Sequence, residues 1–151
     1  MEFLRMGYLI NCDKCKQDSW ADNIVDLIDN HLDKQNLLKC SNCGASGAYI
    51  CKLSETQEKG EWERWIKGVI RIDYKEKEIK NYHPYIFLLS HDGSKGKINS
   101  VQISYYKDLR KTKDGRLKHG HGPGGTPVLN LKDMKNIFQE LFRLGLISKN
   151  K

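Results

Sequence analysis

A chain of 151 residues, with 38% hydrophobic residues, 30% charged residues and a net charge of +7, has the composition of a globular protein and not of a disordered chain. No apolar run approaches the roughly 18 residues that span a bilayer, and Met1–Ile10 lacks the long apolar region and cleavage site of a signal peptide. We therefore expect a cytoplasmic protein with no membrane partner, whose cysteines stay reduced.

The N-terminal third is predicted to contain a strand, a helix and a second strand. Tyr8–Ile10 is an apolar strand. Ser19 followed by Asp22 resembles a capping box, so we expect a helix to begin near Trp20. Tyr49–Leu53 is the second strand. The apolar face of the helix would comprise Ala21, Ile24, Val25, Ile28 and Leu32.

The opposite face of that helix is predicted to be acidic. Like charges spaced three and four residues apart disfavour a helix, so the pattern invites a functional explanation. It would suit a basic protein partner, and it is equally typical of a solvated face. The residues are Asp22, Asp26, Asp29 and Asp33.

Two Cys-x2-Cys pairs flank the predicted helix, separated by 24 residues. A two-residue spacing lets a tight turn direct both sulfurs at one ion, and two such turns supply a tetrahedral shell of four thiolates. The pattern predicts one structural zinc ion; ordinary reduced cysteines, a redox pair and an iron–sulfur cluster are the alternatives. The predicted ligands are Cys12, Cys15, Cys40 and Cys43.

Over about residues 8–53 the two Cys-x2-Cys turns, which we call knuckles, resemble the zinc-ribbon and zinc-knuckle class of domains. A plain ribbon joins its knuckles by hairpin strands, whereas a helix is predicted here. The resemblance implies metal binding without specifying a function, and no family resemblance covers residues 54–151. The fifth cysteine, Cys51, is expected to be a small core residue.

Beyond a polar segment at Ser54–Gly60, the sequence predicts an antiparallel meander. Trp65–Tyr74 is expected to be a strand with Ile66, Ile70 and Ile72 on one side. Further predicted elements are a buried strand at Tyr85–Leu89, a turn at His91–Gly96, an alternating strand over Val101, Ile103 and Tyr105, and a tight turn at Lys113–Arg116.

The last predicted element is an amphipathic helix. Asn130 is its expected N-cap, Asp133 lies in its first turn, and Gly145 suits its C-terminal end. Its apolar face would comprise Met134, Ile137, Phe138, Leu141 and Phe142.

Positive charge is concentrated in residues 54–151, which carry a net charge of +8 against −1 for residues 1–53. Cations neutralise phosphates, and an exposed tyrosine can stack on an unpaired base. The leading hypothesis is therefore a nucleic-acid-binding surface on a basic hairpin, although the same charges could serve only solubility. Its predicted residues are Lys95, Lys97, Tyr106, Lys107, Arg110, Lys111, Lys113, Arg116 and Lys118.

Histidines and a glycine-rich loop are weaker functional signals. Imidazoles can bind a metal or transfer protons, but no HExxH pattern accompanies the set His83, His91, His119 and His121. Gly120–Thr126 has neither a GK[ST] ending nor a GxGxxG pattern, so no nucleotide cofactor is expected.

We expect an α+β fold, with a zinc unit at residues 1–53 and an antiparallel sheet covered by the C-terminal helix at residues 54–151, or both units in one continuous domain. The expected function is binding of DNA or RNA, chiefly through phosphates. The alternative is a protein-interaction module, an adaptor or inhibitor, that uses the zinc unit, the acidic helix or Trp62 and Trp65. A metal-dependent hydrolase or nuclease that uses the loop histidines comes third.

Overall fold

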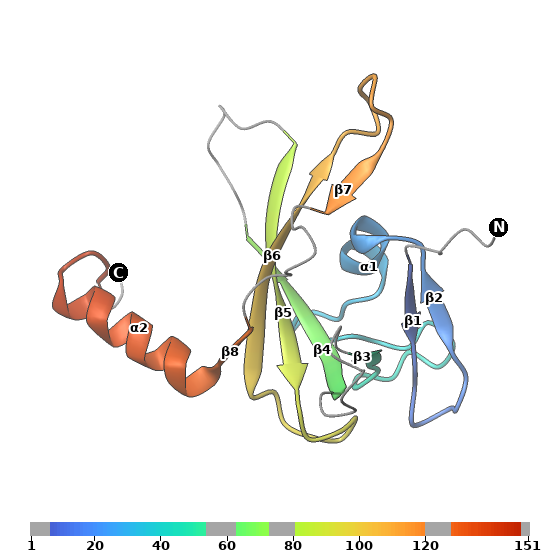
Figure 1. The fold of residues 1–151 in the computed structure, drawn as a ribbon. Helices are drawn as coiled ribbons and strands as arrows, with labels where there is room; N and C mark the ends of the chain where they lie inside the picture. Colours follow the sequence, from blue (N-terminus) through green and yellow to red (C-terminus); the bar gives the residue numbers. More distant parts are fainter. Residues whose placement is uncertain (1–6, 54–62, 73–80, 120–127, 149–151) are drawn as a thin grey trace.

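The computed structural model describes residues 7–53, 63–72, 81–119 and 128–148. Its elements, in chain order, are β1 (Tyr8–Ile10), β2 (Ser19–Ala21), α1 (Ile24–Asn30), β3 (Ile50–Leu53), β4 (Glu63–Arg71), β5 (Tyr82–Ser90), β6 (Ser100–Asp108), β7 (Leu117–His119), β8 (Val128–Asn130) and α2 (Leu131–Arg143). The predicted α+β class is confirmed: a helix lies between the cysteine pairs, the main sheet is antiparallel, and the C-terminal helix contacts β8 (Figure 1).

The main sheet has the order β3-β4-β5-β6-β7, and β8 also pairs with β6. β7 pairs with the last residues of β6, Tyr106–Asp108, whereas β8 pairs with its first residues, Ser100–Gln102. The hairpin that joins β6 to β7 therefore projects from one end of the sheet, and the loop that joins β5 to β6 lies at the other end (Figure 1).

The N-terminal unit, residues 7–49, packs against one face of the sheet, which we call the inner face. Side chains alternate along β5, so that Tyr85, Phe87 and Leu89 are buried on this face. The ring of Tyr8 meets that of Phe87 edge-on, with centroids 6.3 Å apart. The same core includes Ile10, Ala21, Ile24, Leu27, Leu38, Ile66 and Val69.

The predicted capping box at Ser19 is wrong. Ser19–Ala21 forms strand β2, which pairs with Tyr8–Ile10, and the Ser19 hydroxyl oxygen is buried without a hydrogen-bond partner among the described residues. Helix α1 begins four residues later than expected, after Asn23, whose side chain accepts a hydrogen bond from the Asp26 backbone N–H at 2.9 Å. Asparagine caps a helix as well as serine does. The helix therefore begins after Asn23 and not after Ser19 because Ser19 is paired with β1.

The prediction that Ile66, Ile70 and Ile72 share one side of a strand is also wrong. A β-bulge lies between Ile66 and Gly68, so the inward and outward positions exchange along β4. Ile66 and Val69 are buried, whereas Ile70 is 38% and Ile72 36% exposed. The segment of residues 36–38, which precedes the second knuckle, is hydrogen-bonded to the bulge: Leu38 N–H donates to Lys67 O, and Val69 N–H donates to Asn36 O.

The outward side of the sheet, the outer face, is also apolar. Ile86 lies opposite Ile70 on β4 and opposite Ile103 on β6, so the three side chains form a row across three strands. Val101 lies opposite both Leu88 and Leu129 and makes a second row. Ile103 remains 39% exposed, so part of this face is open to solvent.

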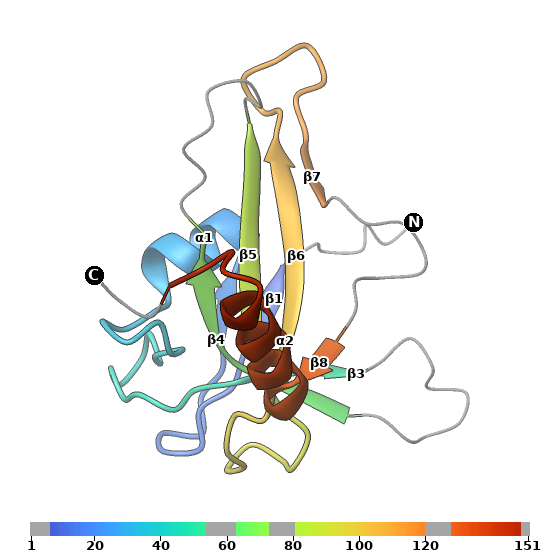
Figure 2. The same ribbon diagram turned by 90° about the vertical axis from the view of Figure 1, so that its left-hand side faces the viewer.

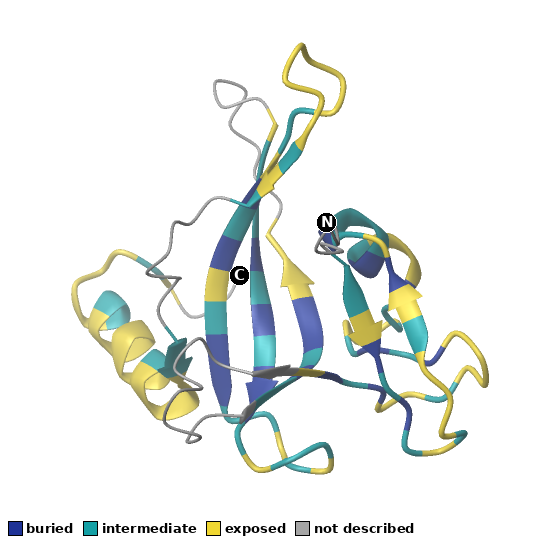
Figure 3. Ribbon diagram, turned by 45° about the vertical axis from the view of Figure 1, so that its right-hand side comes forward, coloured by how far each residue is buried: buried dark blue, intermediate teal, exposed yellow. Residues whose placement is uncertain are grey.

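Helix α2 extends on the side of the outer face (Figures 1 and 2). As predicted, Asn130 is its N-cap, with Oδ1 accepting from the Asp133 N–H at 2.8 Å, and Gly145 follows its end with φ of +70°. The helix contacts β8, and none of its residues is buried (Figure 3). No helix in the described ranges is both long and apolar enough to cross a membrane.

Candidate metal centre

Each cysteine knuckle is a tight turn held by backbone hydrogen bonds. Lys16 N–H donates to Cys12 O at 3.0 Å, and Gly44 N–H donates to Cys40 O at 2.8 Å. Gly44 has φ of +72°, a conformation that glycine adopts without steric cost. The sequence thus builds two equivalent turns, each of which directs a pair of sulfurs to one side.

Neighbouring backbone contacts bring the two knuckles together. Asn11, next to Cys12, exchanges backbone hydrogen bonds of 2.8 and 3.0 Å with Tyr49, which lies just after the second knuckle. The Cys12 and Cys43 sulfurs are 3.7 Å apart, and those of Cys15 and Cys40 are 3.6 Å apart. All four sulfurs lie within 4.8 Å of one another, which is the arrangement of a single metal site.

The four thiols do not hold their protons equally. The backbone N–H groups of Cys43 and Asn42 point at the Cys40 sulfur and, against the effect of burial, lower its pKa to about 7. The pKa of Cys15 is raised to about 12: its contact with the Gln17 backbone lowers it, but burial and the neighbouring thiols raise it by more. A divalent cation would offset the mutual repulsion of four thiolates, and its binding would release protons.

The four cysteines would supply every ligand of a tetrahedral metal ion. Cys12 and Cys40 are buried, Cys15 is half-buried, and Cys43 is exposed at the surface. Four thiolates complete a tetrahedral set and leave no open position for a substrate, which is the pattern of structural sites. Cys51, which the sequence predicted to be a core residue, is exposed instead, because it occupies an outward position of β3 between the inward Ile50 and the end of the strand.

A hydrogen-bond network anchors the first knuckle to the sheet. Asp13 accepts from Tyr49 Oη at 3.2 Å and from Ser94 Oγ at 3.1 Å. Burial opposes ionisation of Asp13, but these two bonds and the nearby Lys16 and Lys95 lower its pKa. Lys67 reaches the same place from the β4 bulge and donates to the backbone oxygen of Ser94.

His31 supports the second knuckle, a structural role that sequence reasoning missed. It follows α1 directly, is 7% exposed, and lies with Nδ1 3.0 Å from Ser41 Oγ. Its Nε2 is 3.6 Å from Asp26 Oδ2, and its backbone oxygen accepts from the Lys39 N–H. The sequence placed His31 inside the predicted helix, whose apolar face extended to Leu32, so its position as the C-cap of α1 was not expected.

Two of the four predicted acidic residues around α1, Asp26 and Asp33, have partners inside the protein. Asp26 accepts from the side chain of Asn30 at 2.7 Å and from the backbone of Asp22 at 2.8 Å. Asp33 accepts from the N–H groups of Gln35 and Leu37 and from Ser46 Oγ. Asp26 and Asp33 therefore hold the ends of the helix and the following turn, which explains their presence without an external basic partner.

The predicted basic surface falls into two parts. Lys95 and Lys97 lie in the loop between β5 and β6, at the far end of β6 from the hairpin of residues 107–118, which we call the basic hairpin (Figure 1). Tyr106 is 7% exposed and stacks on His83, with ring centroids 4.8 Å apart. Its ring is enclosed by its neighbours, so a base could not stack on it without rearrangement.

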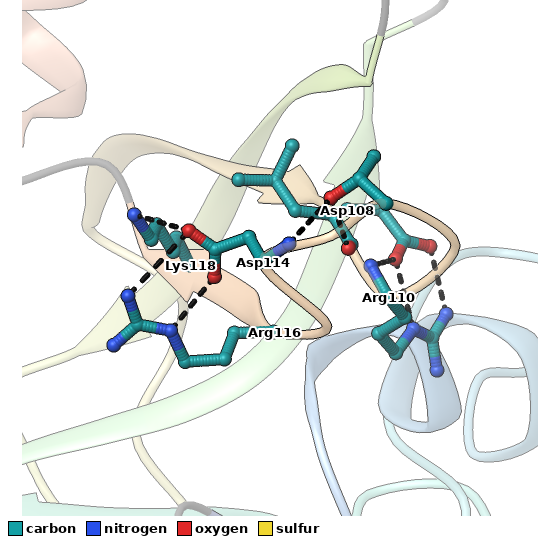
Figure 4. Close-up of polar contacts among 7 residues, drawn as sticks. Asp108, Arg110, Asp114, Arg116 and Lys118 are labelled. Atoms are coloured by element: carbon teal, nitrogen blue, oxygen red, sulfur yellow. Dashed lines mark hydrogen bonds and ion pairs between the residues drawn. The ribbon is translucent and has the colours of Figure 1, made fainter.

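Two aspartates neutralise part of the basic hairpin (Figure 4). Asp108 binds Arg110 through two contacts of 2.8 Å. Asp114 binds Arg116 at 2.7 Å and Lys118 at 2.9 Å. Hydrogen bonds from these arginines lower the pKa of each carboxyl to about 2.

The structure does not gather the predicted histidines into one site. His83 lies in β5 against Tyr106, His91 follows β5 at the opposite end, and His119 ends β7 across from Tyr106. His121 and the glycine-rich loop lie outside the described residues, as does Trp62. In the part of the chain that the structure describes, the cysteine cluster is the one group of His, Cys, Asp and Glu placed to hold a metal.

Comparison of the chain with known protein families, with curated proteins and with solved structures finds no match.

Proposed function

We propose that this protein is a zinc-stabilised nucleic-acid-binding protein, in which one structural zinc ion is held by the four cysteines and the basic hairpin contacts phosphates. The zinc assignment rests on the sulfur spacing. A tetrahedral ion with zinc–sulfur bonds of about 2.3 Å requires sulfurs about 3.8 Å apart. The Cys12–Cys43 and Cys15–Cys40 sulfurs are separated by 3.7 and 3.6 Å, whereas a disulfide requires about 2.05 Å.

The phosphate-binding assignment rests on one observation, which is the concentration of cations on a projecting hairpin. Residues 107–118 contain six basic residues and two aspartates, hence a net charge of +4. Lys107, Lys111 and Lys113 have no ion pair with any described residue. A two-stranded projection of this sign fits against a nucleic-acid backbone, and its width also suits a B-DNA major groove.

The ion pairs of the hairpin do not prevent this role. Asp108 occupies Nε and Nη2 of Arg110, which leaves further N–H donors of the planar guanidinium for a phosphate. Exposed ion pairs of this kind contribute little stability, so a phosphate can replace the carboxylate at small cost. The proposed contact surface therefore comprises the basic hairpin and excludes Tyr106, Lys95 and Lys97.

The test is binding of the zinc-loaded protein to fluorescent single-stranded and duplex DNA and RNA over a salt series. We expect affinity to fall steeply with salt. Changing Lys111, Lys113, Arg116 and Lys118 together to Gln should remove most of the affinity. A matched control changes four exposed lysines elsewhere, Lys14, Lys34, Lys95 and Lys97, and should retain it. Equal losses in both variants would show that net charge, and not this hairpin, drives binding.

A second candidate function, a protein-interaction module, is favoured by helix α2 and not by the acidic helix. Leu131, Ile137 and Phe138 on α2 are each more than 40% exposed, which is unusual for large apolar residues on one helix face. Absence of nucleic-acid binding even at low salt would make this the leading function.

A further inference from the structure

We propose that two copies of this chain form a reciprocal dimer, in which α2 of each copy packs on the outer face of the other copy's sheet. The proposal does not depend on nucleic-acid binding. It starts from two apolar surfaces that the described part of the chain leaves open, one on a helix and one on a sheet.

The first open surface is the apolar face of α2. Leu131, Ile137 and Phe138 are 43%, 43% and 47% exposed, and none of the helix is buried. The exposed side chains lie on the apolar side of α2, along which Met134 is also only partly buried. Large apolar side chains of α2 are therefore left exposed by the described sheet.

The second open surface is the outer face of the sheet. Its row of Ile70, Ile86 and Ile103 crosses three neighbouring strands, and Ile70 and Ile103 are 38% and 39% exposed. Amphipathic helices commonly pack their apolar face on an apolar stripe of this kind across a sheet. Each open surface is thus of the type that covers the other.

The junction between β8 and α2 determines how the helix leaves its own sheet. Asn130 is both the last residue of β8, paired with Ser100, and the N-cap of α2. Leu131 N–H then donates to Asn99 O at 3.0 Å, so no linker separates the strand from the helix. These contacts fix the direction in which α2 leaves the sheet, and in that direction none of its residues is buried.

A second copy meets both needs at once. It offers a helix for the open sheet and a sheet for the open helix, and a two-fold axis makes the two contacts identical. Helix α2 is about 20 Å long and about 11 Å wide, so two helix-on-sheet contacts bury about 900 Å² in total. This is below the size of stable interfaces, so the dimer should dissociate at micromolar concentration.

Sedimentation velocity on the zinc-loaded full chain, from about 5 to about 500 µM, measures this equilibrium. We expect the mass to rise with concentration from the 17.5 kDa of one chain towards twice that value. Added salt should favour the dimer, because it screens repulsion between positively charged copies. A monomer at every concentration would overturn the proposal.

Two variants test the reciprocal arrangement, one on each surface. Phe138→Lys alters only the helix and Ile103→Glu only the sheet, and each should weaken dimerisation at least tenfold. Asn136→Lys adds the same charge on the opposite side of α2 and should dimerise normally. Circular dichroism and zinc content confirm folding, and Ile70→Glu replaces Ile103→Glu if the latter fails to fold.

Mixing the two variants gives the sharpest test. In a mixed dimer, one helix-on-sheet contact is unaltered, and the other places the two introduced side chains, which are opposite in charge, against each other. Dimerisation should therefore return. A helix-to-helix dimer would instead be broken by Phe138→Lys and unaffected by Ile103→Glu. That result, or no recovery on mixing, would overturn the reciprocal arrangement.

Discussion

Asp13, inside the first cysteine knuckle, accepts a hydrogen bond from Ser94, which lies 81 residues further along the chain. The same carboxylate accepts from Tyr49, and Lys67 donates to the backbone of Ser94. One aspartate therefore connects the candidate metal centre with the loop between β5 and β6 and with the bulge of β4.

Ser94→Ala is expected to destabilise the protein without removing the metal. The variant loses the bond to Asp13 but leaves all four sulfurs in place, so urea unfolding should shift to a lower midpoint while zinc content stays at one ion per chain. Ser41→Ala tests whether the effect is specific to this network, because Ser41 contacts His31 instead. Loss of zinc from the Ser94 variant would show that the network positions the knuckle itself.

Cys40→Ser should abolish tight zinc binding and destabilise the N-terminal unit. Cys40 is 1% exposed and its sulfur accepts hydrogen bonds from backbone N–H groups of the knuckle, which favour the thiolate form that binds a metal. Loss of a structural zinc site costs several kcal/mol of folding free energy. Cys51→Ser is the matched control, and it should keep both the metal and the stability. Metal analysis and thermal unfolding with and without a chelator check both variants.

Zinc affinity should increase with pH between about pH 6 and pH 8, because each ligand must lose its proton before it binds. The raised pKa of Cys15 keeps that thiol protonated at neutral pH, so binding should release at least one proton. The lowered pKa of Cys40, about 7, means that part of this thiol is already ionised there. Calorimetry in buffers of different ionisation enthalpy counts the protons. A pH-independent affinity would contradict thiolate ligation.

Gly68→Ala is predicted to destabilise the protein by about 2 kcal/mol or more, because an added Cβ would lie 2.3 Å from the Asn36 backbone oxygen. Gly115→Ala is the comparison: nothing lies within 4 Å of its Cβ, and only its φ of +67° is strained, at about 1 kcal/mol. Urea unfolding of both variants gives the two values. Equal costs would mean that the bulge accommodates a side chain.

Asp108→Asn and Asp114→Asn are expected to strengthen nucleic-acid binding. Each change removes a negative charge and releases Arg110, or Arg116 and Lys118, for phosphate contacts. Each additional phosphate bound should steepen the plot of log affinity against log salt by about 0.9 for duplex DNA. Glu140→Gln, which releases Arg143 on α2, should leave the slope unchanged. Weaker binding in the aspartate variants would indicate that they hold the hairpin in its binding shape.

Local patterns predicted much of this molecule. The two Cys-x2-Cys pairs needed only short turns to form, and the Asn130 cap and the glycine after α2 act within a few residues of the helix ends. The strands at β5 and β6 were found because alternation of apolar residues survives without knowledge of the partner strand.

Features that depend on distant residues could not be predicted in the same way. Strand β2 exists because Ser19–Ala21 pairs with β1, and the bulge at Gly68 exists because the segment 36–38 bonds to it. Burial of Tyr106 depends on His83 in a neighbouring strand. The two Asp–Arg pairs were not predicted, because a sum of charges along the sequence does not pair them and Arg110, Asp114 and Arg116 all lie in the turn between β6 and β7, where no strand alternation applies.

The position of the cysteines along the chain has a consequence for synthesis. All four precede residue 44, whereas the apolar groups that complete the core around α1 and β1 include Ile66, Val69, Tyr85, Phe87 and Leu89. On the ribosome, residues 12–43 emerge before those groups do, so a bound metal ion would close the loop between residues 12 and 43 first and so shorten the unfolded segment. The ion would then hold the N-terminal unit together before the hydrophobic core is complete, and would lie beside that core in the finished fold.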